Sequence, residues 1–134
     1  MEVRWKGEVA DDELSRLHSA SFGLPFRMTN WNELLSRHSL GWVTARIDAR
    51  LVGFVNVPWD GLVHAWIQDV IVDPDRQRGG IGTAVVAAAA HGARAAGCEW
   101  LHVDFDDEHR PFYLDACGFV PTAAGLIDLT VESD

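Results

Sequence analysis

The stretch that decides the fold is Val70-Ile-Val-Asp-Pro-Asp-Arg-Gln-Arg-Gly-Gly-Ile-Gly-Thr83. It predicts a strand ending at Val72, a turn at Asp73-Pro74, and a glycine-bearing loop that opens a helix at Gly80. A helix N-terminus carries unpaired N–H groups and about half a positive charge, so it attracts phosphate. Glycines remove the side chains that would hold a pyrophosphate off the backbone. Two arginines of the loop add charged donors.

Two common phosphate-binding loops do not fit this stretch. A Walker A loop needs a lysine directly before the serine or threonine at the helix start, and Gly82-Thr83 has none. A dinucleotide-binding loop needs a small residue where Val85 stands, and it normally closes the first strand of its sheet. The glycines alone are also compatible with a turn that binds nothing.

Hydrophobic periodicity on either side of the loop predicts one mixed α/β domain over residues 1–134, with a mostly antiparallel twisted sheet and helices on both faces. The expected elements, in chain order, are a strand at Glu2–Arg4, a helix capped by Asp11, a helix capped by Asn30, a hairpin of Trp42–Ile47 and Leu51–Val57, a long strand Leu62–Val72, a helix Gly80–Ala96, a strand Trp100–Phe105 buried on both sides, a short helix Pro111–Cys117, and closing strands at Phe119 and Leu126–Val131.

Composition excludes several classes of protein. The 134 residues are 48% hydrophobic and 23% charged, as expected for a soluble globular domain. A net charge of −9 opposes binding to nucleic acid or to an anionic membrane. The charge is compatible with a cationic partner, and it is equally explained by the need to keep the protein soluble. With no apolar span and no signal-like opening, we expect a cytoplasmic protein. Cys98 and Cys117 lack the spacing of a zinc site, so we expect reduced thiols and no metal.

The run Gln77-Arg78-Gly79-Gly80-Ile81-Gly82 resembles the Q/R-x-x-G-x-G/A signature of the GCN5-related N-acetyltransferases. In that family the signature follows a strand ending in V-x-P, as Val72-Asp73-Pro74 does here. The segment Pro111–Phe119 resembles the family's F-Y-x-x-x-G-F element. The resemblance covers essentially the whole chain and is strongest over residues 66–119.

The resemblance implies an N-acetyltransferase that uses acetyl-CoA as cosubstrate and transfers acetyl to an amine in a ternary complex. The amine can belong to a small molecule or to a protein, and we expect a small-molecule amine; a homodimer also stays open. Tyr113 occupies the position of the tyrosine that protonates the departing thiolate, a role that suits a phenol. The backbone of Val70, Ile71 and Val72 would pair with the pantetheine arm. The pyrophosphate would be held by the N–H groups of Arg78, Gly79, Gly80, Ile81, Gly82 and Thr83.

The general base is less defined, because the chain departs from the family pattern at two positions. Gln68 stands where many members have a glutamate, and Asp106 stands where an asparagine often contacts the cofactor. Asp69 is the preferred base, although strand alternation turns it away from the face of Gln68 unless a bulge intervenes. The other candidates for the base are His64, His102 and Asp104.

The departures keep two other functions open: a CoA-binding regulatory module without catalysis, and an interaction domain without a ligand. For the enzyme, the acidic charge favours a primary amine that is positively charged before it reacts. Carboxylates gather just before the predicted tyrosine helix, at Asp104, Asp106, Asp107 and Glu108. Aromatic residues that could hold the acceptor, or equally belong to the core, are Phe22, Phe26, Trp31 and Trp59.

Overall fold

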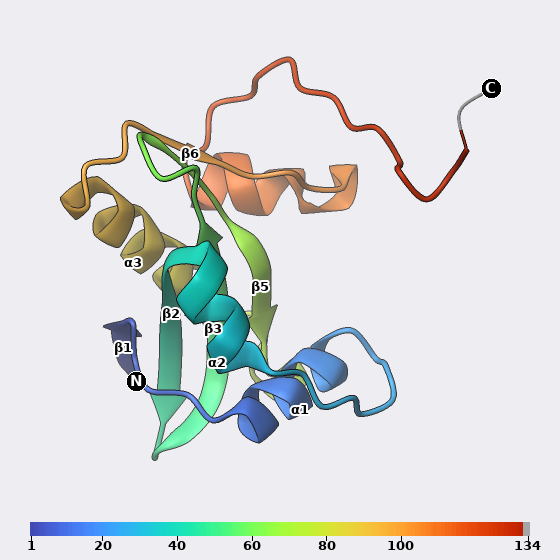
Figure 1. The fold of residues 1–134 in the computed structure, drawn as a ribbon. Helices are drawn as coiled ribbons and strands as arrows, with labels where there is room; N and C mark the ends of the chain where they lie inside the picture. The colour runs from blue at the N-terminus through green and yellow to red at the C-terminus, as the bar shows by residue number, and fades with distance from the viewer. Residues whose placement is uncertain (133–134) are drawn as a thin grey trace.

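The computed structural model describes residues 1–132 of the chain (Figure 1). An antiparallel sheet has the order β1-β2-β3-β5, and a separate parallel pair joins β4 to β6. The strands are β1 (Glu2–Trp5), β2 (Ser39–Ile47), β3 (Arg50–Pro58), β4 (His64–Trp66), β5 (Gln68–Val72) and β6 (Trp100–His102). The helices are α1 (Asp11–Ser21), α2 (Trp31–His38) and α3 (Ile81–Ala95), with short turns η1 (Pro74–Arg76), η2 (Asp107–His109) and η3 (Pro111–Ala116).

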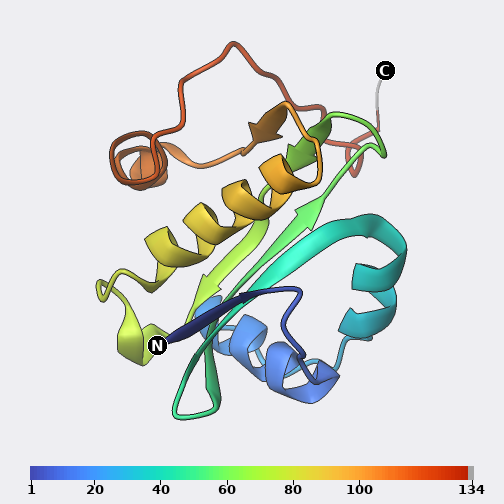
Figure 2. The same cartoon turned by 90° about the vertical axis from the view of Figure 1, so that its left-hand side faces the viewer.

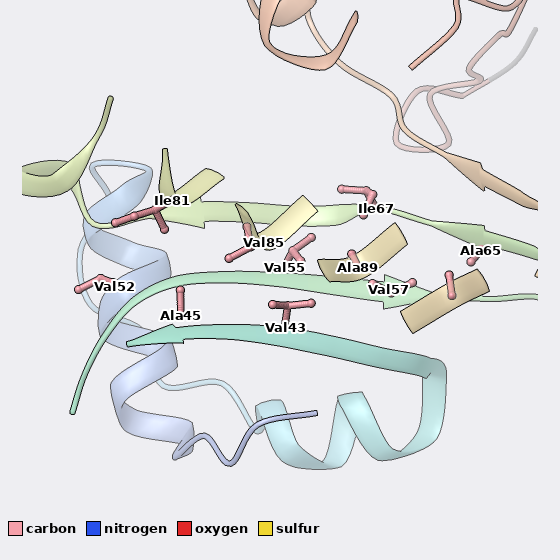
Figure 3. Packing of buried hydrophobic residues seen from close by; sticks show 11 residues of the cluster. Val43, Ala45, Val52, Val55, Val57, Ala65, Ile67, Ile81, Val85 and Ala89 are labelled. Atoms are coloured by element: carbon pink, nitrogen blue, oxygen red, sulfur yellow. The ribbon is translucent and has the colours of Figure 1, made fainter. Parts of the chain in front are cut away.

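Helices cover both faces of the antiparallel sheet, as the sequence predicts (Figure 2). On one face α3 packs against the sheet through a valine- and alanine-rich core (Figure 3). On the other face α1 and α2 pack over Phe54 and Ile71. Because β3 lies between these two layers, residues 51–57 are all buried. No helix within residues 1–132 is long and apolar enough to cross a membrane.

Glycine allows β1, β2 and α3 to meet around one indole ring. A Cβ on Gly41 of β2 would lie 2.1 Å from the Trp5 side chain, and a Cβ on Gly92 of α3 would lie 2.4 Å from it. Neither position tolerates a larger side chain without moving the ring. The small residues of the alanine-rich helix therefore serve close packing, and they bring α3 down onto the sheet.

The predicted long strand Leu62–Val72 is in fact two strands. Residues 64–66 pair with β6, whereas residues 68–72 pair with β3. On the β3 side, Phe54 faces Ile71 and Asn56 faces Gln68, so three steps along β5 match two along β3. The extra residue is a β-bulge, which bends the strand and increases its twist. This bend separates the two pairings.

Three other expectations need correction. Asp11 is the first residue of α1 and Ala10 is its cap, where the Ala10 N–H donates to the Glu13 carboxylate at 2.9 Å.

The strand predicted at Trp100–Phe105 ends at His102, and it is buried on one side only: the Trp100 side chain is 64% exposed. Ala65 and Leu101 face the core cluster that includes α3, whereas the other face of the pair meets solvent.

The predicted closing strands at Phe119 and Leu126–Val131 do not form. Residues 119–131 are irregular, and Leu126, Ile127 and Leu129 are 83–90% exposed. The segment runs away from both sheets (Figure 1). Apolar alternation gives a segment the capacity to be a strand, but a strand also needs a neighbouring edge to pair with. Among the described residues, no strand pairs with this segment, although β1 and β6 each have a strand partner on one edge only.

Candidate active site

The sheet opens where β4 passes into β5. The last pair between β4 and β6 is Trp66 with His102, followed by one hydrogen bond from the Ile67 N–H to the His102 carbonyl oxygen at 2.8 Å. Beyond it, β5 follows β3 and residues 103–105 diverge. Within residues 1–132, β5 therefore has a strand partner on one edge only. The backbone of its other edge is available to an extended ligand, and Val70–Val72 lie on this edge.

The N-terminus of α3 has no side-chain cap among the described residues. Gly80 is the cap residue with φ +83°, and Arg78 in the preceding loop has φ +69°. Within the described part of the chain, no side chain caps this helix and its first turn carries no acid. A Cβ at Gly80 would find no described atom within 4 Å. The first N–H groups of the helix therefore face open space, which fits a pyrophosphate.

Asp73 holds the strand-to-loop turn in place. Its side chain is buried, accepts a hydrogen bond from the Asp75 N–H at 3.0 Å, and forms an ion pair with Arg50 at 3.1 Å. Its own N–H donates to the Val52 carbonyl oxygen of β3 at 2.8 Å. Asp73 thus fixes the turn that aims the glycine loop.

Gly82 also has a packing role that the sequence alone does not indicate. A Cβ there would lie 3.2 Å from two carbons of the Phe112 ring and 3.7 Å from Val72. The missing side chain therefore makes room for η3 beside the first turn of α3. Gly82 thus makes room for the tyrosine helix, while Gly80 leaves open space beside the helix N-terminus.

Tyr113 lies on η3 among aromatic rings. Its ring stacks on Phe105 with centroids 5.1 Å apart and meets the edge of Phe119 at 6.0 Å. The turn is wound as a π-helix, closed by a bond from the Cys117 N–H to the Phe112 oxygen at 3.0 Å. Burial, and secondarily the Cys117 thiol, raise the pKa of the phenol. Tyr113 therefore keeps its proton at neutral pH and can donate it.

Asp69 is the residue at the bulge, with φ +58°. Asp69 and Ile71 are two residues apart and share the face toward α1 and α2. The bulge brings Gln68 onto this face as well, because its partner Asn56 lies two residues from Phe54, the partner of Ile71. The condition that the sequence left open is therefore met. Burial raises the pKa of the Asp69 carboxyl, and the charge of His18 on α1 partly opposes the rise. A left-handed backbone at a non-glycine residue costs about 1 kcal/mol, so the neighbouring strands must hold it.

The other candidate bases are spread around the opening. The His64 Nδ1 and His102 Nε2 atoms are 2.8 Å apart, and Asp104 is exposed two residues further along. Gln68 is exposed, and Asp106 lies in the exposed acidic loop before η3.

Sequence reasoning missed His18 as a neighbour of Asp69. The only signal was that His18 falls one turn after Leu14, on the face of α1 that packs against the sheet.

Comparison with known proteins agrees with this geometry. Residues 8–119 match the acetyltransferase (GNAT) family. A curated relative, the chloroplastic GCN5-related N-acetyltransferase 1 of Arabidopsis thaliana, is 39% identical over 77 residues. That match covers 54% of this chain and 39% of the relative, so the matched region is well under half of the longer protein.

Solved structures share the fold across nearly the whole chain. Glucosamine-6-phosphate N-acetyltransferase from Arabidopsis thaliana is 14% identical with a TM-score of 0.74, covering 96% of this chain and 98% of that one. An aminoglycoside acetyltransferase from an uncultured soil metagenomic sample, solved with sisomicin, is 21% identical with a TM-score of 0.72, covering 98% and 95%. The fold is thus the one seen in solved acetyltransferase structures. The chain belongs to the GNAT family of acetyltransferases.

Proposed function

We propose that this chain transfers the acetyl group of acetyl-CoA directly to a small primary amine that is positively charged before it reacts. The observation that carries the proposal is the opening in the sheet. One side of it is the edge of β5 that has no strand partner within residues 1–132, and this edge leads to a helix N-terminus that no described side chain caps. Near it lie a neutral phenol and a carboxylate, each with a raised pKa. Such a pair suits acid and base roles in one reaction.

The cosubstrate would lie along β5. The backbone groups of Val70, Ile71 and Val72 would pair with its pantetheine arm, as an added strand does. The N–H groups of the loop and first turn, residues 78–83, would hold its pyrophosphate. When bound, acetyl-CoA supplies an acetyl group activated as a thioester. The chain's own part is to place that group within reach of Asp69 and Tyr113.

Asp69 and Tyr113 would handle the proton transfers. The Asp69 carboxylate takes a proton from the ammonium group, and its raised pKa brings it closer to working pH than an ordinary aspartate. The freed amine nitrogen forms a bond to the acetyl carbon as the carbon–sulfur bond breaks. The Tyr113 hydroxyl then gives its proton to the leaving sulfur. The new amide nitrogen loses its surplus proton to the Tyr113 phenolate, which restores the hydroxyl, and the proton held by Asp69 passes to water.

A second candidate function is a CoA-binding regulatory module without catalysis. It is favoured by Gln68, which stands where many family members have a glutamate, and by Asp106, which stands where an asparagine often contacts the cofactor.

Charge favours a cationic acceptor. The chain has a net charge of −9, and the carboxylates of Asp104, Asp106, Asp107 and Glu108 are all exposed before η3. Of the aromatic candidates, Trp31 is 4% exposed and belongs to the core. Phe22 and Phe26 are exposed, and the Arg16 guanidinium lies 5.5 Å from the centre of the Phe26 ring. That arginine makes Phe26 a poor site for a second cation.

A free-thiol release assay with acetyl-CoA and a panel of amines tests the proposal. We expect release only with amines, and a KM for the best acceptor that rises with salt, because exposed charges are screened over about 8 Å at 0.15 M ionic strength. Replacing Asp106, Asp107 and Glu108 by their amides should raise the same KM. A neutral best acceptor would refute the charge assignment. CoA binding without any release would favour the regulatory module.

A further inference from the structure

Four rings lie on the outer face of the β4–β6 pair. His64 faces Trp100 and Trp66 faces His102 in the strand register, so these four side chains share one face. The residues between them point the other way, where Ala65 is fully buried and Leu101 packs against the core under α3. On the outer face the Trp66 side chain is 37% exposed and that of Trp100 is 64% exposed.

The inner part of this ring array is preassembled. The Trp66 and His102 rings stack with centroids 5.0 Å apart and planes 19° apart. His64 stacks on His102 at 5.0 Å, and the two rings share the 2.8 Å contact between nitrogens. Asp60 fixes the strand start, because its carboxylate accepts the His64 N–H at 3.2 Å and the Leu62 N–H at 2.7 Å. A ligand would meet this surface without having to order it.

The array ends at the opening of the sheet. Trp66 and His102 form the last pair before the strands separate. Asp104 lies on the same face as His102, since Val103 between them packs toward α3. Asp69 lies on the corresponding face of β5, which it shares with Ile71. On this face, therefore, the opening has a carboxylate on either side and stacked rings where it begins.

We propose that Trp66, held by His102, is the platform that selects the acceptor, and that it favours an amine carried on a rigid six-membered ring. This inference rests on the proposed function. The flat apolar face of such a ring stacks on indole, and its ammonium group lies within the reach of Asp104 and Asp69. A rigid ring also loses less conformational freedom on binding than a linear alkylamine does. The pantetheine edge and Tyr113 use none of these side chains.

The test compares Trp66→Leu with Trp100→Leu. Trp100 is a matched control, because it has the same side chain on the same face, one register pair further from the opening. Wild type should show a lower KM for glucosamine and cyclohexylmethylamine than for n-hexylamine. In Trp66→Leu the KM for both ring amines should rise roughly tenfold, as expected for a lost stacking contact. The KM values for n-hexylamine and acetyl-CoA, and every value in Trp100→Leu, should stay within about twofold.

Further measurements keep the result decisive. Trp66→Tyr retains a flat ring and should restore the low KM, and it serves if Trp66→Leu melts below assay temperature. If Trp66→Leu raises the KM of only glucosamine or only cyclohexylmethylamine, the platform is specific for that type of ring. Equal ring and linear KM values in wild type, or equal losses in both tryptophan variants, would overturn the platform. If wild type releases no thiol with any amine, the proposed function fails, and calorimetry of glucosamine with the CoA-saturated protein decides the platform by the same variants.

Discussion

Replacing Gly80 by alanine should separate the anion-binding role of the loop from its folding role. Gly80 has φ +83°, where an L-residue costs about 1 kcal/mol. In a domain of this size that lowers the melting temperature by roughly 3–5 °C. No described atom lies within 4 Å of the new Cβ, so it causes no clash and the fold should persist. We expect the methyl group to take up part of the open space beside the first N–H groups of α3 that a pyrophosphate would use.

The loss of cofactor binding should exceed the loss of stability. Hydrogen bonds to a charged group contribute about 1.5–3 kcal/mol each, so losing one weakens binding by roughly tenfold to a hundredfold. Calorimetry should show this increase in the Kd for CoA. Pantetheine is the matched ligand, because it lacks the pyrophosphate, and its Kd should not change. The melting temperature of the free protein measures the folding cost in the same samples.

Gly82→Ala provides the contrasting variant. Its Cβ would lie 3.2 Å from the Phe112 ring, which must shift by a few tenths of an ångström, and Phe112 adjoins Tyr113 with ring centroids 4.8 Å apart. We expect kcat to fall while the Kd for CoA changes little. If Gly80→Ala lowers the melting temperature and leaves the Kd for CoA unchanged, the loop is a structural turn and the reasoning fails.

Other expected outcomes concern the cofactor, the acid and the base. Saturating CoA, at a hundredfold excess over Kd, should stabilise the protein by about 2.7 kcal/mol, and an unchanged melting temperature would contradict binding. Tyr113→Phe should lower kcat by roughly a hundredfold with the Kd for acetyl-CoA unchanged; full activity would remove Tyr113 from the chemistry unless product release limits turnover. Activity should rise with pH through the pKa of Asp69, which burial places above its ordinary value of 3.8. The same burial disfavours the charged Asp69 carboxylate in the folded protein. The folded protein is therefore more stable below the ordinary pKa of Asp69, where the carboxyl is protonated, and this stability is lost as pH rises through the raised pKa. Asp69→Asn should therefore flatten the acid limb and raise the melting temperature more at pH 7 than at pH 3, and an acid limb that persists would assign the base elsewhere.

Local sequence determined the features that depend only on neighbouring residues. Gly80 marks the helix start because a positive φ at the cap suits glycine, and Pro111 marks the start of the tyrosine helix because its ring fits a first turn. Period-two alternation located the β2–β3 hairpin. The family resemblance, carried by the glycine loop and the segment around Tyr113, is confirmed by the family match over residues 8–119.

Tertiary structure decided whatever depends on two segments meeting. The bulge at Asp69 is a mismatch between β5 and β3, so it does not exist in either strand alone. The role of Gly82 follows from Phe112, which lies thirty residues along the chain and reaches it only after folding. Residues 126–131 alternate as a strand would and still pair with no described strand. Alternation fixes the face a side chain would take, whereas pairing, register and the bend of the sheet are set by the neighbour, and the neighbour is chosen only by the packed fold.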